Sequence, residues 1–193
     1  MPEQINSRRV YALDIETTGL LIPRSGISGS DEIIQLAIVA EDGSILFNEY
    51  FRPEHTHIKP YAQRINSISY DMIKDEPTFS DRLSTIQKII DEAGLIVTYN
   101  AEFDMAFLTE QGVCASGIPV FCMMKAFTQL RLTRRPIAKT IRRYSLEQCA
   151  QYFGVEITGN THDALTDART TLACYREMCK QIGTVAKQVQ NYA

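Results

Sequence analysis

The hydrophobic pattern of this chain changes its period about a third of the way along the sequence. Before that point, β-forming apolar residues cluster in three short runs, at residues 10–15, 32–40 and 44–51, which predict strands. Glu41-Asp42-Gly43 lies between the second and third runs, and Asp-Gly is a strong hairpin signal. The first third of the chain therefore predicts an antiparallel meander.

Beyond residue 80 the apolar residues recur at helical spacing, interrupted by one more strand. Ser80 is the expected N-cap of the first helix and Gly94 its expected end. Residues 95–99 predict a short buried strand, and residues 102–111 predict a second helix. This alternation of helix and strand indicates a mixed α/β sheet flanked by helices.

Two further helices are expected near the C-terminus. Ser145 and Gln148 have the spacing of a capping box for a short helix that stops near Gly154. The last helix has an apolar stripe that predicts core packing along its length. The stripe consists of Leu165, Ala168, Leu172, Tyr175, Cys179 and Ile182. Because no linker divides the chain, we expect a single domain over residues 1–193, with a core at about 8–182 and a short polar tail.

Composition excludes several classes of protein. The chain has 193 residues and a formal net charge of −3, which argues against a protein that coats nucleic acid by bulk positive charge. Its five cysteines include no Cys-x-x-Cys pair, so neither a disulfide framework nor a zinc site is expected, and most of them should be buried. Residues 1–9 lack the apolar stretch of a signal peptide, and no run suits a membrane span. We therefore expect a cytoplasmic protein without membrane contact.

Acidic residues occur at the ends of several of these elements. Asp14 and Glu16 alternate along the first strand, so both carboxylates point to one face. Asp104 lies in the first turn of the helix that follows the buried strand. His162 stands at the start of the last helix, and Asp167 lies about one turn into it. Each residue alone has an ordinary explanation, as a solvated strand end, a helix-dipole partner, a cap or an exposed helix face.

Taken together, these residues indicate a metal-dependent reaction. Four convergent carboxylates repel each other strongly unless cations neutralise them. Hard oxygen ligands suit Mg²⁺ or Mn²⁺, and two such ions about 3.5–4 Å apart commonly cleave phosphodiesters. The constellation therefore predicts a divalent-cation site that acts on nucleic acid.

Three segments of the chain resemble, in order, the three motifs of the DEDD exonuclease superfamily, in the branch whose third motif carries a histidine. The segments are Asp14-x-Glu16-Thr-Thr-Gly, Asn100-Ala-x-Phe-Asp104 and His162-x-Ala-x-x-Asp167. The resemblance covers about residues 10–182. It implies a ribonuclease-H-like fold, with a mixed five-stranded sheet that begins with the antiparallel meander and has helices on both faces. The chain is also similar to the epsilon proofreading subfamily of bacterial replicative polymerase and its stand-alone relatives, although that subfamily usually has a histidine where Asn66 stands.

The resemblance implies a 3′-5′ exonuclease that hydrolyses the 3′ end of single-stranded or frayed DNA and releases nucleoside 5′-monophosphates. Asp14, Glu16 and Asp167 would hold two divalent cations, Mg²⁺ with Mn²⁺ as a substitute. Asp104 would complete the second metal site directly or through water. His162 would be the general base, because an imidazole changes charge near neutral pH.

The same resemblance implies a set of substrate contacts. The candidates are Thr17, Thr18, Gly19, Leu20, Asn66, Asn100 and Phe103. Backbone groups that follow the acidic strand would hold the terminal nucleotide, with Leu20 against its base. Phe103 is one helical turn from Phe107, so core packing is favoured over base stacking for it.

Residues 125–143 carry seven basic residues and no acidic residue. They are Lys125, Arg131, Arg134, Arg135, Lys139, Arg142 and Arg143. A solvated face is the ordinary interpretation of such a run, and contact with phosphates is the alternative beside a nuclease motif. On the second interpretation, neutralising Arg134, Arg135 and Arg142 would weaken the binding of long strands and flatten its salt dependence.

Several alternatives stay open at this stage. The expected partner is a single-stranded 3′ end, with DNA favoured over RNA, but an exonuclease that trims RNA ends would carry the same motifs. A catalytically silent nucleic-acid-binding module is a further alternative. A polymerase-associated subunit is less favoured than a free-standing nuclease, because no docking segment is evident after Ile182. The motifs leave the oligomeric state undetermined.

Overall fold

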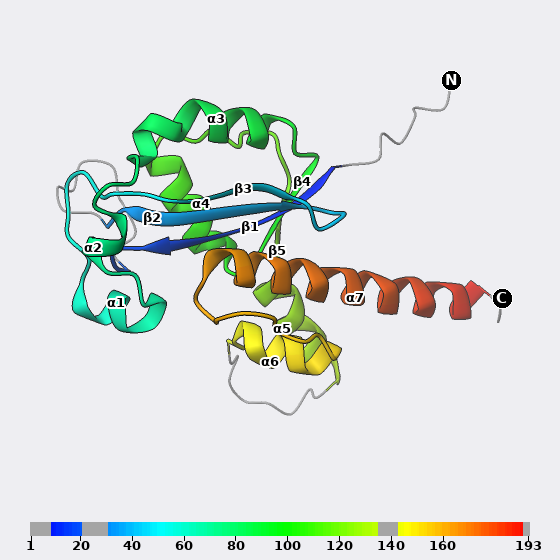
Figure 1. Ribbon diagram of the computed structural model, residues 1–193. Coiled ribbons are helices and arrows are strands. Elements are labelled where there is room, and N and C mark those ends of the chain that lie inside the picture. The colour runs from blue at the N-terminus through cyan, green and yellow to red at the C-terminus, as the bar shows by residue number, and fades with distance from the viewer. Residues whose placement is uncertain (1–8, 21–30, 135–142, 191–193) are drawn as a thin grey trace, which may run out of the picture.

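The computed structural model describes residues 9–20, 31–134 and 143–190, with side chains over 9–20, 31–132 and 143–182. Five strands form one sheet in the order β3-β2-β1-β4-β5 (Figure 1). The strands are β1 (Val10–Thr17), β2 (Ile33–Ala40), β3 (Ile45–Tyr50), β4 (Leu95–Thr98) and β5 (Val120–Cys122). The first three pair in antiparallel fashion, while β4 is parallel to β1 and β5 is parallel to β4. The predicted meander and mixed sheet are confirmed.

The hairpin between β2 and β3 forms where Asp-Gly predicts it. The Gly43 N–H donates to the Ala40 carbonyl oxygen at 2.8 Å, and Gly43 has a φ of 92°. The Asp42 carboxylate accepts the backbone N–H of Ser44 at 2.9 Å. A left-handed φ is almost free of strain only for glycine, which explains the turn at this position.

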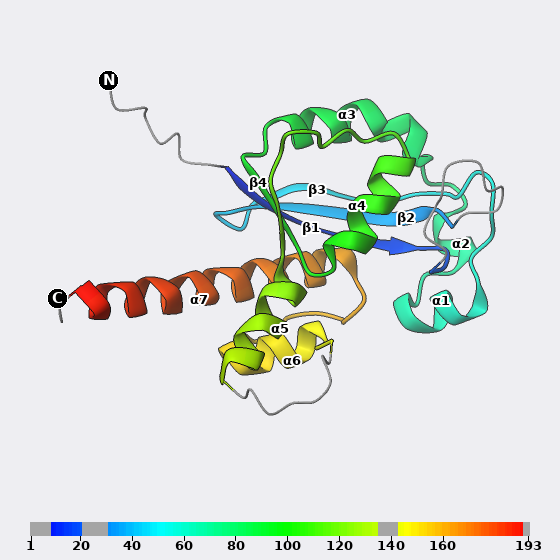
Figure 2. The same ribbon diagram turned by 180° about the vertical axis from the view of Figure 1, so that it is seen from behind.

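Helices cover both faces of the sheet (Figures 1 and 2). They are α1 (Pro60–Asn66), α2 (Tyr70–Ile73), α3 (Phe79–Asp91), α4 (Ala101–Glu110), α5 (Met123–Arg134), α6 (Leu146–Phe153) and α7 (Ala164–Gln190). On one face, α3 and α4 pack against Tyr11 and Leu13 of β1. On the other face, α7 packs against Val10 and Ala12. Because side chains alternate along a strand, Asp14 and Glu16 fall on the face that α7 covers.

The predicted ends of α3 are wrong by a few residues. Thr78, not Ser80, is the N-cap, and its side chain forms a capping box with Asp81. The Ser80 hydroxyl instead donates to Glu54 at 2.6 Å. The helix ends at Asp91, three residues before Gly94. The Gly94 N–H donates to the Arg9 carbonyl oxygen at 2.9 Å, so Gly94 already belongs to the connection between α3 and β4.

The two C-terminal helices follow their sequence signals to different extents. Ser145 and Gln148 form the predicted capping box of α6, and Gly154 ends this helix with a φ of 69°. Along α7, Ala168 and Leu172 are buried, but Ile182 is 61% exposed. An eight-residue strand spans roughly 26 Å, whereas a 27-residue helix spans about 40 Å. The end of α7 therefore projects beyond the sheet (Figure 1), and the stripe is not core packing along its whole length.

The cysteines are all free, but the expectation that most are buried is wrong. Cys149 and Cys174 are buried, Cys122 is partly buried, and Cys114 and Cys179 are exposed. Cys179 is exposed although the neighbouring Met178 is buried, so at this turn of α7 the packed side is the one that carries Met178. No helix of the described part of the chain is long and apolar enough to cross a membrane.

Candidate active site

A cleft of about 410 Å³ opens at the C-terminal end of β1. Its walls come from β1, α1, the first turn of α4, the segment that leads into α6, and the start of α7. Every predicted site residue except Thr18 lines this cleft. These residues are Asp14, Glu16, Thr17, Gly19, Leu20, Asn66, Asn100, Phe103, Asp104, His162 and Asp167.

The sheet topology brings the four acids together. Asp14 and Glu16 lie on the face of β1 that packs against α7, whose first turns carry Asp167. Since β4 is parallel to β1, the two strands end at the same edge of the sheet. Asp104 lies in the first turn of α4, immediately after β4, and so reaches that edge as well.

Three of the side chains form a compact set of potential ligands. One ligand atom from each of Glu16, His162 and Asp167 lies within 4.8 Å of the other two. The His162 backbone N–H donates to Asp167 Oδ2 at 3.2 Å. His162 also has a φ of 60°, a left-handed conformation that is uncommon outside glycine and is concentrated at functional sites.

Burial and mutual repulsion raise the pKa values of the carboxyl groups. Burial, followed by repulsion from Asp167, raises the pKa of Glu16 to about 8. Burial also raises the pKa of Asp104 to about 7, although the Thr98 hydroxyl, at 2.5 Å, opposes this shift. The pKa of Asp14 lies well above its usual range because of burial and then the charges of Asp104 and Glu16.

Asp167 is the least perturbed of the four acids. Burial raises its pKa to about 6, against the lowering effect of His162. Within the described part of the chain, no lysine or arginine lines the cleft. Closely spaced carboxylates that no lysine or arginine neutralises are suitable ligands for one or more hard divalent cations, which prefer oxygen ligands.

The segment after β1 is held in place on one side of the cleft. The Thr17 hydroxyl donates to the Gly19 carbonyl oxygen at 2.6 Å. The Leu20 N–H donates to the Tyr61 hydroxyl at 2.9 Å, and the Leu20 side chain is 63% exposed. At Gly19 an added Cβ would lie 2.4 Å from an oxygen of Asp31, so only glycine fits without movement.

Thr18 points away from the cleft. Its hydroxyl donates to the buried Asp31 carboxylate at 3.0 Å, and its N–H and carbonyl oxygen bond to Glu32 and Lys59. Lys59 also pairs with Asp31 at 2.8 Å. Thr18 therefore anchors the segment that its neighbours present to the cleft. Asp31, Lys59 and Tyr61 have no distinctive sequence signal, which is why sequence analysis missed them.

The remaining candidates line the cleft in different ways. The Asn66 amide donates to the Thr17 carbonyl oxygen at 3.3 Å and opposes the rise in the pKa of Glu16. Asn100 is the N-cap of α4 but makes no side-chain capping bond. Phe103 packs on Phe107 with ring centroids 4.8 Å apart and also lines the cleft, so it belongs to both core and site.

Gln35 is a buried polar residue near the candidate site that sequence analysis missed. It lies opposite Glu16 in the β1/β2 register and is 1% exposed. Its Nε2 donates to Asp163 at 3.0 Å, and its Oε1 accepts the Ala164 N–H at 3.1 Å. These bonds fix the start of α7, which carries Asp167 and directly follows the turn that holds His162. The available signal was one polar residue in an otherwise apolar strand.

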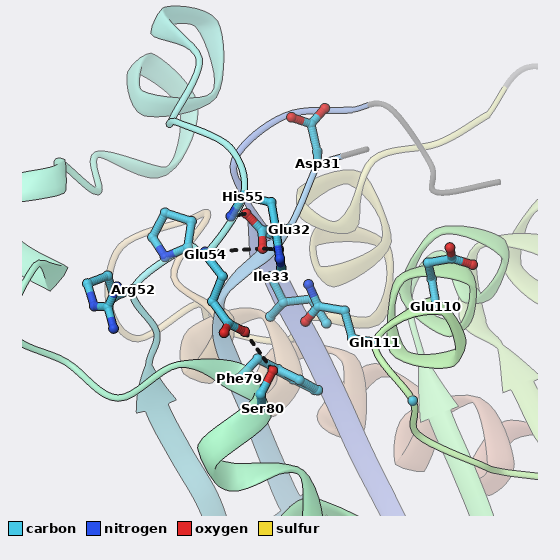
Figure 3. Close-up of a pocket in the computed structure, with 12 residues that line it drawn as sticks. Asp31, Glu32, Ile33, Arg52, Glu54, His55, Phe79, Ser80, Glu110 and Gln111 are labelled. Carbon is cyan, nitrogen blue, oxygen red and sulfur yellow. Dashed lines mark hydrogen bonds and ion pairs between the residues drawn. The ribbon is translucent and has the colours of Figure 1, made fainter. Parts of the chain in front are cut away.

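A second hollow, of about 400 Å³, lies near the start of β2 and contains none of the predicted site residues (Figure 3). Three of its acidic groups, on Asp31, Glu32 and Glu54, form hydrogen bonds within the protein. The Glu32 carboxylate accepts the backbone N–H groups of Glu54, His55 and Thr56 at 2.9–3.2 Å. This hollow therefore differs from the cleft, whose described lining holds no lysine or arginine to pair with its carboxylates.

Comparison with known proteins places the chain beside nucleases and replicative polymerase proteins. The exonuclease family model (RNase_T) matches residues 11–175. The DNA polymerase III PolC-type protein of Staphylococcus saprophyticus is 30% identical over 175 residues, which is 88% of this chain but 11% of that protein. DNA polymerase III subunit epsilon of Rickettsia felis is 29% identical over 182 residues, 90% of this chain and 75% of that protein.

One solved structure illustrates the shared fold. The nuclease domain of 3′hExo, described as a DEDDh family member bound to rAMP, aligns with a TM-score of 0.65 at 17% identity. The alignment covers 90% of this chain and 92% of that domain. The ribonuclease-H-like fold expected from the motifs is thereby confirmed.

Proposed function

The chain belongs to the exonuclease family, among the DEDDh 3′-5′ exonucleases, and on that premise we propose that it removes nucleotides from the 3′ end of single-stranded or frayed DNA. Each turnover would hydrolyse one phosphodiester bond and release a nucleoside 5′-monophosphate. The observation that carries the proposal is the meeting of four carboxylates and His162 in a cleft whose described lining holds no lysine or arginine.

The acids would act as cation ligands. Asp14, Glu16 and Asp167 would hold two divalent cations, with Asp104 completing the second site directly or through water. Bound Mg²⁺ or Mn²⁺ would supply positive charge to the reacting phosphate and lower the pKa of the attacking water. The raised pKa values support this role, because burial and then mutual repulsion disfavour the ionised form of Asp14 and Glu16 in the metal-free protein.

His162 would be the general base that accepts the proton of the attacking water. Its side chain is exposed at the cleft and lies with Glu16 and Asp167 in the compact ligand set. An imidazole changes charge near neutral pH, which suits proton transfer under physiological conditions. The hydrogen bond from its backbone to Asp167 would keep it at the entrance of the carboxylate cluster.

The terminal nucleotide would lie against the segment after β1. Thr17, Gly19 and the exposed Leu20 line the cleft, as do Asn100 and Phe103. DNA is favoured over RNA because the two sequence relatives described above are DNA polymerase III proteins. The protein would act as a free-standing nuclease, without a polymerase partner.

The test uses 5′-labelled single-stranded DNA, mismatched duplex DNA and single-stranded RNA, each with Mg²⁺, Mn²⁺ or a chelator. We expect a ladder that shortens from the 3′ end of DNA, requires the cation, and disappears in Asp14→Ala while that variant stays folded. Faster shortening of RNA than of DNA would show that RNA 3′ ends are the substrate. Turnover by Asp14→Ala would refute the metal assignment. If no substrate is cleaved, the protein is instead a nucleic-acid-binding module without catalytic activity. Co-purification with a polymerase would show that the protein acts as a subunit.

A further inference from the structure

A small aromatic hollow lies beside the proposed active site, between α5 and α6. Its volume is about 300 Å³, and we call it the α5–α6 hollow. It is lined by Phe127, Arg131, Tyr144, Gln148, Gln151 and Tyr152. We propose that the α5–α6 hollow binds a base of the substrate strand upstream of the 3′-terminal nucleotide, an inference that rests on the proposed function.

The hollow adjoins the catalytic cleft. Tyr144 lines both of them. The next residues, Ser145, Leu146 and Glu147, line the cleft, whereas Gln148 lines the hollow. The start of α6 is therefore a shared wall, and a strand whose 3′ end occupies the cleft can pass over this wall into the hollow.

The lining has the chemistry of a base-stacking site. The Arg131 guanidinium carbon lies 5.0 Å from the ring centroid of Tyr152 and 5.7 Å from that of Tyr144. Bases stack on tyrosine rings and on guanidinium planes with little dependence on sequence. An exonuclease that degrades any sequence requires this kind of contact, because a base-specific contact would stall it.

The aromatic groups are held rigidly before any ligand binds. Phe127 is 1% exposed, and its ring packs against Tyr144 and Tyr152 with centroid separations of 5.2 Å in each case. Side chains that are already ordered lose little conformational entropy on binding, which favours affinity. The hollow is therefore preorganised to accept a flat ring.

Charge and hydrogen-bonding capacity also favour a nucleic-acid occupant. No acidic residue lines the hollow within the described part of the chain, while Arg131 contributes a positive charge. Arg143, which precedes Tyr144, is exposed and can meet a phosphate between cleft and hollow. Gln151 is exposed at the rim and has both a donor and an acceptor for base edges.

The hollow gives a partial role to the basic run at residues 125–143. Arg131 belongs to the hollow, whereas Lys125 pairs with Glu102 at 2.6 Å. The side chains of Arg134, Arg135, Lys139 and Arg142 lie outside the described residues. The predicted effect of neutralising Arg134, Arg135 and Arg142 therefore stays a prediction, and Arg131 is the residue that the structure singles out.

The experiment compares substrates that can and cannot reach the hollow. The short substrates are a dinucleotide and the 4-nitrophenyl ester of thymidine 5′-monophosphate. The long substrates are single-stranded oligonucleotides of up to eight nucleotides, each with one abasic residue moved stepwise upstream from the 3′ end. For the wild type, we expect kcat/KM to fall on the order of 10-fold when the abasic residue reaches one upstream position, as expected from loss of one stacked base.

Arg131→Ala should reproduce this loss on intact long strands and leave both short substrates unaffected. In this variant the abasic residue should cause no further loss, because base and guanidinium act in the same contact. Arg9→Ala is the matched control, since it removes the same charge at an exposed site paired with Glu92, far from the hollow in the fold. Melting temperatures of both variants verify that they remain folded.

Two results would overturn the inference. One is a wild-type kcat/KM that is the same for every position of the abasic residue, a test that needs no variant. The other is an equal loss for Arg131→Ala and Arg9→Ala, which would show only bulk charge. If neither short nor long substrates are hydrolysed, the proposed function fails. In that case, fluorescence anisotropy in Ca²⁺ can compare the affinity of the protein for intact strands with its affinity for the abasic strands. This comparison decides whether binding depends on the upstream base.

Discussion

Removing divalent cations should make this protein less stable as the pH rises from 5 to 8. The folded state holds the Glu16 and Asp104 carboxyl groups at pKa values of about 8 and about 7, above their usual values of 4.5 and 3.8. Below the usual values these groups are protonated in both states and cost nothing. Between the usual and the raised pKa only the folded state keeps the proton, so stability is lost progressively as the pH rises.

The size of the effect follows from these shifts. One pKa unit corresponds to about 1.4 kcal/mol for one group. The acids of the cluster share protons, so their contributions do not simply add, and a loss on the order of a few kcal/mol is expected between pH 5 and 8. For a domain of this size, about 1 kcal/mol shifts the melting temperature by roughly 2–4 °C, which gives a decrease of about 5–10 °C.

The assay is thermal unfolding by circular dichroism at pH 5 to 8 with a chelator, repeated with saturating Mg²⁺. A cation at about 100 times its dissociation constant should restore roughly 2.7 kcal/mol at pH 8. Asp14→Asn is the control, because it removes one repelling charge with little change of shape. This variant should melt higher than the wild type at pH 8 without cations and should respond less to Mg²⁺.

The reasoning would be wrong if the metal-free wild type melted at a constant or rising temperature from pH 5 to 8. It would also be wrong if Asp14→Asn kept the full pH dependence of the wild type. Either result would mean that burial and mutual repulsion do not disfavour the ionised carboxylates in the folded protein. The raised pKa values would then be wrong, and the assignment of the cluster as a cation site would lose its physical basis.

Three further substitutions test individual contacts. His162→Ala should lower the rate at neutral pH by about 10²–10⁴-fold while Mg²⁺ still raises the melting temperature, and an unchanged pH–rate profile would exclude it as the base. Gln35→Leu should cost about 1–3 kcal/mol in a denaturant titration and lower kcat, because Asp163 loses its partner at the start of α7. Gly19→Ala should raise KM, because the added Cβ of the alanine would clash with Asp31. An unchanged KM would show that the segment after β1 can move to accommodate the Cβ without cost to substrate binding.

Local sequence signals were reliable where the residues that form a turn or a cap are close together in the sequence. Asp-Gly makes the turn before β3, and Ser145 with Gln148 caps α6, because both devices act within a few residues. Thr78 shows the limit of such signals. Either Thr78 or Ser80 can cap a helix, and the choice depends on Asp81 and on a distant contact of Ser80 with Glu54.

Elements without a strong period were not predicted from the sequence alone. The three-residue strand β5, the short helices α1 and α2, and α5 each depend on neighbours that are distant in sequence. Ile182 shows the opposite error, since an apolar position at the correct spacing is exposed where α7 passes the end of the sheet. Periodicity identifies a potential buried face, but only packing decides how far that face is covered.

The sequence by itself determined the chemistry that the site can have. Asp14 and Glu16 had to share one face of a strand, and the order of the three motifs specified which acids and which histidine belong together. Only the tertiary structure decided that these groups meet, because convergence depends on the parallel pairing of β4 with β1 and on the packing of α7. It also decided their raised pKa values, since burial and repulsion arise from distances that no local pattern contains. For the same reason, the anchoring role of Gln35 and the hollow around Arg131 became visible only in the folded chain.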